Sequence, residues 1–309
     1  MQSLRRSTYD AARGGRVGLE PVCALCVIVA CMRTVAISAL IALTALASVA
    51  VAYGPVPLPT ERPEGKVPRA SAVRAAGSYA RGRAGVVSFA VVDTKGKLRG
   101  RDEGRRYPAA SVVKAMLLAA EIRRLKHAGV GIDSNTDSLL RAMITRSDNA
   151  AADAIYGRVG DGGLFRVARR ARMRRFTVAG HWGNAQITAA DMARFYLGLR
   201  GNLVRTYRRF GLRLLAHVTE LQRWGIPQGA GRGWRIWFKG GWRPAQEEET
   251  SGPVTHQAAL LRHRTGARLA LAILTEESPG TGGGFEAIAG IARRLLRPPP
   301  PGPGRWPAG

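Results

Sequence analysis

The stretch "SVVKAMLLAAEI", residues 111–122, sets the question that the rest of the sequence answers. It is apolar on almost every side, which predicts a buried helix that starts at Ser111. Yet its fourth residue is Lys114, one of only six lysines in a chain with 48 lysine and arginine residues. Arginine stays protonated in a protein, whereas burial can make a lysine neutral. The choice of lysine therefore indicates an amine that gives up its proton.

Ser111 lies one helical turn before Lys114, so a helix that begins at Ser111 puts the hydroxyl and the amine on one face. A serine hydroxyl becomes a good nucleophile when a neighbour takes its proton, and a desolvated lysine can do so. The structural alternative is a serine N-cap followed by a lysine whose stem lies along apolar surface. The pair alone leaves both interpretations open.

A second motif, Ser147-Asp148-Asn149, lies in "AMITRSDNAAADAIY", residues 142–156. Ser, Asp and Asn before an alanine-rich run are typical of a helix N-cap. As chemistry, the triplet offers a second hydroxyl to relay a proton and an amide to hold a substrate carbonyl. The motif by itself supports the cap and the functional role equally.

A third motif, Lys239-Gly240-Gly241, ends the predicted strand "WRIWFK", residues 234–239. A strand that runs into a glycine turn is common. In a functional interpretation, the glycines let a substrate approach the backbone, and a main-chain N–H near Trp242 joins that of Ser111 in an oxyanion hole. Lys239 would then supply positive charge for a substrate carboxylate.

Strands are expected at both ends of the folded part, with helices between them. Residues 86–100, "VVSFAVVDTKGKLRG", predict two strands with a turn at 95–97. Three more strands and a last helix are predicted at 234–241, 254–263, 267–275 and 285–296, and helices at 137–146, 149–158, 188–200 and 204–222. This order predicts one sheet assembled from distant parts of the chain, with an all-α insertion.

The three motifs, in this order, resemble the SxxK, SDN and KTG set of the class A β-lactamases and penicillin-recognising serine hydrolases. The flanking segments "YPAASVVKAMLLAAEI", "MITRSDNAAADAIY" and "ITAADMARF" are similar too, and the resemblance covers roughly residues 70–297. It implies an α/β (α+β) sandwich: an antiparallel sheet from the N- and C-terminal segments, flanked by helices, with an all-α insertion. It also implies roles for the motif residues: Ser111 as acylated nucleophile, Lys114 as its base, Ser147 as proton relay, and Asn149 and Lys239 as substrate-binding residues.

The sequence departs from that family in the segment that supplies the base for hydrolysis of the acyl-enzyme. The family uses a glutamate on its omega loop, but no glutamate occurs between Glu121 and Glu220. "VAGHWGNAQ", residues 178–186, stands in place of E-x-x-L-N, in a loop that is expected to be shortened. His181 is a candidate substitute base, with a packed loop histidine as the alternative. Gly240 replaces the threonine of KTG, and the spacing from Ser111 to Ser147 is short, so acylation is expected more than efficient hydrolysis.

The N-terminal region predicts export. Residues 34–53 carry no charge, follow Arg33 and end in "AVA" at 50–52, as in a secretory signal. Met32 is the expected start, with 1–31 as an upstream extension, and an uncleaved anchor is the alternative. All three cysteines, Cys23, Cys26 and Cys31, lie in this region. A proline-rich linker at 53–70, a hydrolase domain at 71–297 and a proline- and glycine-rich tail at 298–309 are expected to follow, with the domain outside the cytoplasmic membrane.

The formal net charge of +27 is spread along the chain, as expected for a GC-rich genome, without a nucleic-acid-binding module. No histidine spacing predicts a metal site, and no cofactor is expected. The predicted function is an exported serine hydrolase that acts as a monomer on a β-lactam or related amide or ester, including a peptidoglycan-like substrate. The alternatives are a penicillin-binding or DD-peptidase-like protein with slow deacylation, and a catalytically silent protein that binds an anionic wall polymer or membrane surface.

Overall fold

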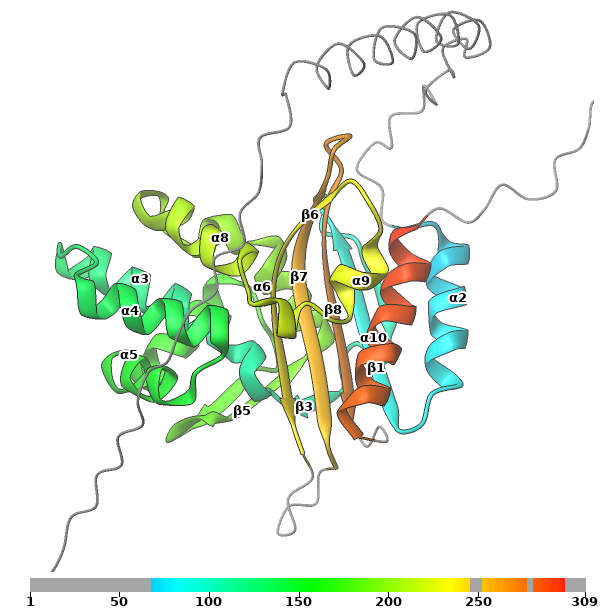
Figure 1. Ribbon diagram of the computed structural model, residues 1–309, viewed down its shortest axis with the longest axis horizontal. Helices are drawn as coiled ribbons and strands as arrows, with labels where there is room; N and C mark the ends of the chain where they lie inside the picture. The colour runs from blue at the N-terminus through cyan, green and yellow to red at the C-terminus, as the bar shows by residue number, and fades with distance from the viewer. Residues whose placement is uncertain (1–67, 245–251, 277–279, 298–309) are drawn as a thin grey trace, which may run out of the picture. The chain divides into compact units, whose positions relative to one another are not determined.

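The computed structural model describes residues 68–244, 252–276 and 280–297 (Figure 1). They belong to one compact unit, Arg62–Gly309. The predicted signal or anchor at 1–52, residues 53–67 of the linker predicted at 53–70, and the tail at 298–309 lie outside the described residues, and the last linker residue, Ala70, begins a helix. Among the helices that the structure describes, none is long and apolar enough to cross a membrane.

A five-stranded antiparallel sheet with the order β2-β1-β8-β7-β6 forms the centre of the fold. Its strands are β1 (Val86–Asp93), β2 (Leu98–Arg101), β6 (Trp234–Arg243), β7 (Val254–His263) and β8 (Arg268–Glu276). The register of β1 and β8 runs from Val86 opposite Glu276 to Asp93 opposite Leu269. The expected sheet from distant parts of the chain is confirmed.

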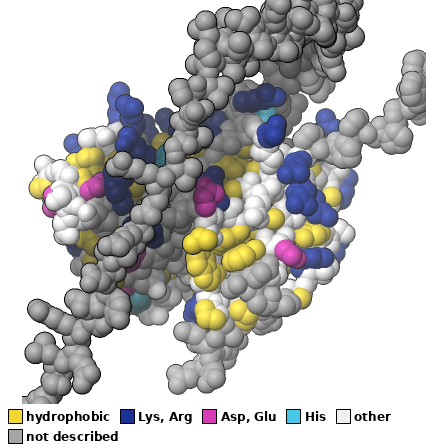
Figure 2. All heavy atoms as spheres, viewed as in Figure 1, with side chains coloured by type: hydrophobic (Ala, Val, Ile, Leu, Met, Phe, Trp, Pro, Cys, Tyr) yellow, Lys and Arg dark blue, Asp and Glu magenta, His cyan; other side chains and the backbone are white. Residues whose placement is uncertain are grey.

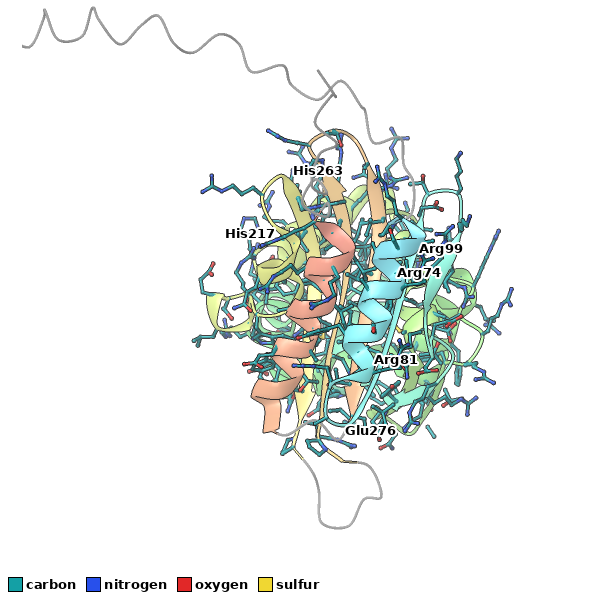
Figure 3. The ribbon with its side chains drawn as sticks, turned by 90° about the vertical axis from the view of Figure 1, so that its right-hand side faces the viewer. Arg74, Arg81, Arg99, His217, His263 and Glu276 are labelled. Carbon is teal, nitrogen blue, oxygen red and sulfur yellow. The ribbon has the colours of Figure 1, made fainter. Side chains whose placement is uncertain are left out.

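Both faces of this sheet are buried, because alternate side chains of each strand enter different cores. In β8, Leu271 and Ile273 join one hydrophobic cluster, whereas Ala272 and Leu274 join the other. One face is covered by α2 (Ala70–Arg81) and α10 (Gly280–Leu296), which lie side by side in Figure 3, and by α9 (Ile226–Ala230). The other face is covered by α6 (Ala189–Leu197) and the helical insertion.

The helical insertion contains the α-helices expected between the outer strands, with different bounds. It consists of α3 (Lys114–Ala128), α4 (Ser134–Arg141), α5 (Asn149–Arg170), α7 (Leu199–Asn202) and α8 (Arg208–Ala216), with short turns η1 (Ala110–Val113), η2 (Ala142–Arg146), η3 (Arg205–Tyr207) and η4 (Glu220–Gln222). The helical segment predicted near 204–222 is divided into η3, α8 and η4. The α-helix predicted from Ser111 begins instead at Lys114, after the 3-10 turn η1, whose first residue Ala110 has a left-handed backbone with φ of 44°.

The segment "VAGHWGNAQ" was expected to be a loop, and the structure corrects this. It forms a β-hairpin from β4 (Thr177–Ala179) and β5 (His181–Thr188), with Gly180 at the turn at φ of 69°. β5 also pairs with β3 (Arg106–Pro108), giving a second sheet of order β3-β5-β4. Trp182, Ala185 and Ile187 are buried, so the hairpin packs its own apolar side chains into the core. Their spacing is not a strict alternation, which hid the strand in the sequence.

Candidate active site

Ser111 lies in η1, between the end of β3 and the start of α3. The chain before it is fixed from two sides: Ala109 N–H donates to Ala185 O (2.8 Å), and the His256 ring nitrogen Nε2 lies 2.9 Å from Pro108 O. The left-handed backbone of Ala110 costs roughly 1–3 kcal/mol in a non-glycine residue and needs such support. The hydroxyl of Ser111 is therefore presented from an anchored turn.

Strand β6 passes against the backbone of this turn at Gly241. A Cβ atom on Gly241 would lie 2.6 Å from Ser111 N and 2.8 Å from Val112 N, closer than real Cβ contacts. Only a residue without a side chain allows this approach. The main chain of the third motif is thus in contact with the main chain of the first, as an oxyanion hole would require.

Lys114 is fully buried at the start of α3. Its Nζ donates to Ser147 O (2.7 Å) and to Asn149 Oδ1 (2.6 Å), and no hydrogen bond to Ser111 is found among the described residues. Burial lowers the pKa of Lys114 to about 8, against the opposing charge of Asp148. The amine can therefore be neutral near physiological pH, as a base for a serine must be.

The three residues of the second motif divide the roles that the sequence left open. The Asp148 side chain caps α5 by accepting from Ala151 N–H (2.7 Å). Ser147 has a left-handed backbone with φ of 63°, at the end of the π-helical turn η2, and offers its carbonyl oxygen to Lys114. The cap interpretation holds for Asp148, while Ser147 and Asn149 contact the buried lysine.

Lys239 reaches the same point from the sheet. It is fully buried, and its Nζ donates to Ser147 Oγ (3.0 Å), Gln222 Oε1 (3.2 Å) and Gly240 O (2.8 Å). Burial, together with the charge of Lys114, lowers the pKa of Lys239 well below its usual range. Ser147 thus joins two buried lysines, one through each of its oxygen atoms.

Gly240 and Trp242 face away from the lysines, towards aromatic side chains. A Cβ on Gly240 would lie 2.9 Å from Cζ2 of Trp224, so the Trp224 ring occupies the space next to this glycine. Trp224 stacks on Phe285 at 4.2 Å and meets Trp242 edge to face at 6.1 Å. Trp242 is 40% exposed. The place of the family's threonine is therefore apolar here.

An open pocket of about 440 Å³ adjoins these aromatic residues. It is lined by Glu220, Leu221, Arg223, Trp224, Pro227 and Gln228. Figure 2 shows hydrophobic side chains gathered over the region where β6 and α9 lie in Figure 1, with Lys and Arg side chains dispersed around the same face. The pocket next to the third motif thus combines apolar side chains with the charged Glu220 and Arg223.

The β4–β5 hairpin faces Lys114 from the other side. The centroid of the Trp182 ring lies 4.8 Å from Lys114 Nζ, and the indole N–H donates to Asp153 Oδ1 (2.6 Å). His181 Nε2 lies 3.0 Å from the same Asp153 oxygen, while its Nδ1 accepts from Gly183 N–H (3.1 Å). Both ring nitrogens of His181 are therefore in hydrogen bonds, and its role as a base stays a prediction.

The structure brings Lys114, Ser147, Asn149 and Lys239 together and places Gly241 against Ser111. The sequence analysis missed four residues near the site, because a sequence motif does not mark a residue whose contacts form only in the folded chain. They are Gln222, Trp182, Asp153 and Trp224. These four residues lie in a short turn, a hairpin, a helix and a connecting segment, and they carry no spacing signal. Among the described residues, no group of three His, Cys, Asp or Glu side chains is placed to hold a metal ion.

A sequence profile of the beta-lactamase enzyme family matches residues 125–297. No curated protein sequence matches the chain. Among solved structures, the fold is similar to a beta-lactamase from Sphaerobacter thermophilus DSM 20745 (22% identity, 74% of this chain, 99% of that chain, TM-score 0.62). It is also similar to one from Xanthomonas campestris pv. campestris (19%, 73% and 96%, 0.62) and to TLA-1 extended-spectrum beta-lactamase (14%, 73% and 97%, 0.66). At these identities the likeness establishes the fold, which is that of class A β-lactamases.

Proposed function

The chain belongs to the beta-lactamase enzyme family, and we propose that it is a serine hydrolase that forms an acyl-enzyme on Ser111. The observation that supports this most is the pair of buried lysines joined by Ser147, beside the anchored turn of Ser111. Two ammonium groups so close and so poorly solvated disfavour each other's charge. At least one amine is therefore available to accept a proton.

In the proposed acylation, Ser111 Oγ attacks a carbonyl carbon of the substrate and transfers its proton to neutral Lys114 Nζ. A C–O bond forms, and the C–N bond of the amide breaks. Ser147 Oγ, which accepts from Lys239 Nζ, passes a proton to the leaving nitrogen. Ser147 Oγ then takes up the proton that Lys114 received from Ser111, so that both Ser147 and Lys114 return to their starting protonation states.

The proposed substrate is a β-lactam or another amide or ester with a carboxylate near the bond that breaks, such as a peptidoglycan-like peptide. The main-chain N–H groups of Ser111 and Trp242 are proposed to stabilise the oxyanion. Lys239 binds the substrate carboxylate, whose negative charge would raise the lowered pKa of this lysine. Substrate binding and charging of Lys239 would then be coupled.

We also propose that the domain works outside the cytoplasmic membrane, on the basis of the signal-like stretch at 34–53. Detection of the protein outside the membrane, and loss of that location when 34–53 is deleted, tests this. A silent protein that binds an anionic wall polymer is the rival. Its affinity for the polymer should fall steeply with salt and be unaffected by Ser111→Ala.

The test of the proposed function is an intact-mass time course of the purified protein mixed with a penicillin. A covalent adduct should form on the parent and on Ser138→Ala, which changes an exposed serine of α4, but not on Ser111→Ala. Adduct formation by Ser111→Ala would show that another residue is the nucleophile. Absence of any adduct, with no loss of penicillin, would contradict β-lactam chemistry.

A further inference from the structure

The inference concerns Trp182 and rests on the proposed acylation of Ser111. Trp182 is 7% exposed, and its ring lies flat enough against Lys114 for a cation–π contact, with 4.8 Å between Nζ and the ring centroid. The other contacts of this amine are the oxygen atoms of Ser147 and Asn149. An aromatic surface therefore covers one side of the Lys114 amine, next to its two hydrogen bonds.

Asp153 holds the Trp182 ring in this position. It lies four residues after Asn149 on α5, so the two side chains share a helix face. Its Oδ1 accepts from the indole N–H (2.6 Å), and the hydrogen bonds from Trp182 and then His181 lower the pKa of its carboxyl group. Asp153 is thus a charged acceptor at neutral pH, committed to the hairpin.

Hydrolysis of an acyl-serine ester needs a water molecule beside the carbonyl carbon and a base to take its proton. Among the described residues, no carboxylate oxygen is hydrogen-bonded to Lys114, and Asp153, the acidic side chain beside Trp182, is already hydrogen-bonded to the Trp182 indole and to His181. An indole face cannot hydrogen-bond water as a base would. The surface that Trp182 presents to Lys114 therefore offers water no base.

We propose that Trp182, positioned by Asp153, shields the acyl-enzyme from water, so that the protein acylates readily and releases the acyl group slowly. In the slow step, a water oxygen attacks the ester carbon, the bond to Ser111 Oγ breaks, and the serine regains a proton. Trp182 and Asp153 are positioning residues that set the lifetime of the ester. Of the two enzymes considered from the sequence, this geometry favours the penicillin-binding or DD-peptidase-like protein, which deacylates slowly.

The test follows the decay of the penicillin adduct by intact mass after free penicillin is removed. Trp182→Ala should shorten the adduct lifetime at least tenfold, whereas Trp182→Phe, which keeps an aromatic face, should stay close to the parent. Asp153→Ala should shorten it several-fold, and Asp153→Asn, which keeps an acceptor oxygen, should restore most of it. Trp234→Ala, a tryptophan at the far end of β6, is the control and should change nothing.

Thermal unfolding of each variant checks that it folds. If Trp182→Ala does not fold, the Asp153 variants provide the test, because Asp153 is exposed. Equal adduct lifetimes in the parent, Trp182→Ala and Asp153→Ala would overturn the shield while leaving acylation intact. A parent adduct that decays within seconds would overturn it too. The absence of any adduct contradicts the proposed function itself, so the two failures are distinguishable.

Discussion

The two lysines of the site are held in different ways. On the helical side, which comprises Lys114, Asn149 and Trp182, the contacts come from a helix and a hairpin and depend on the exposed carboxylate of Asp153. On the sheet side, which comprises Lys239, Gly241 and their neighbours in β6 and β7, Lys239 extends from β6 and contacts the Gly240 carbonyl, the buried Gln222 of η4 and the hydroxyl of Ser147. In the proposed mechanism, the sheet side fixes position, while the helical side controls access of protons and water.

Exchange of the helical-side lysine should have the largest effect. Lys114→Arg keeps the positive charge but removes the ability to lose a proton, so the acylation rate should fall roughly 10²–10⁴-fold. Lys126→Arg, on the exposed part of the same helix, is the matched control and should acylate like the parent. The adduct time course measures both. A Lys114→Arg variant that acylates at the parent rate would exclude Lys114 as the base.

The pH dependence should sharpen this result. Because burial lowers the pKa of Lys114 to about 8, the neutral fraction grows as the pH rises through that value, and the acylation rate should grow with it. Rates measured from pH 6 to pH 9 should show one titrating group near 8. A rate that is flat across this range would mean that the base is not this amine.

The sheet side should respond to acid through His256. Burial lowers its pKa to about 4, whereas the unfolded chain takes up a proton near 6.5, so the unfolded state binds more protons between these values. Stability should fall as the pH falls from 6.5 to 4, by about 3 kcal/mol in total. Urea unfolding at pH 7 and pH 4.5 measures this. His256→Gln should reduce the loss of unfolding free energy between pH 7 and pH 4.5, whereas His217→Gln, at an exposed position, should not.

A smaller effect is expected from a side chain added where β6 contacts the turn of Ser111. Gly241→Ala should destabilise the protein by about 2 kcal/mol and slow acylation, because its Cβ would meet Ser111 N at 2.6 Å. Gly77→Ala is the control: it lies in α2 with open space around it, and should add about 0.5–1 kcal/mol of stability. Equal effects of the two alanines would contradict the close approach.

The smallest effect should come from restoring the family's threonine. Gly240→Thr should cost about 1 kcal/mol, because its Cβ would lie 2.9 Å from the Trp224 ring, and should not speed acylation. In a Trp224→Leu background the same substitution should be tolerated better, giving a coupling in a double-mutant cycle. Additive effects on the unfolding free energy would show that the ring and the glycine are independent.

The sequence was sufficient for the large sheet, because β1 and β8 are almost continuous apolar runs and β7 contains the apolar stretch AALL, at residues 258–261. It was also sufficient for the lysines and for Ser147, since their motifs are short and local. It failed for the β4–β5 hairpin, whose buried residues do not alternate, and for the break of the predicted helix at 204–222, which tertiary packing imposes. Asp153 and Trp224 acquire their contacts only when distant elements meet, and no local pattern records that.

The pairing of β1 with β8 has a kinetic consequence. Val86 lies opposite Glu276, so the sheet closes only after almost the whole domain has been synthesised, and closing so long a loop is entropically slow. The helical insertion can form local contacts earlier, but Lys239 and Gly241 reach Ser147 and Ser111 only with the completed sheet. A partly folded chain therefore lacks the paired lysines, and reactivity of Ser111 would report the completion of folding.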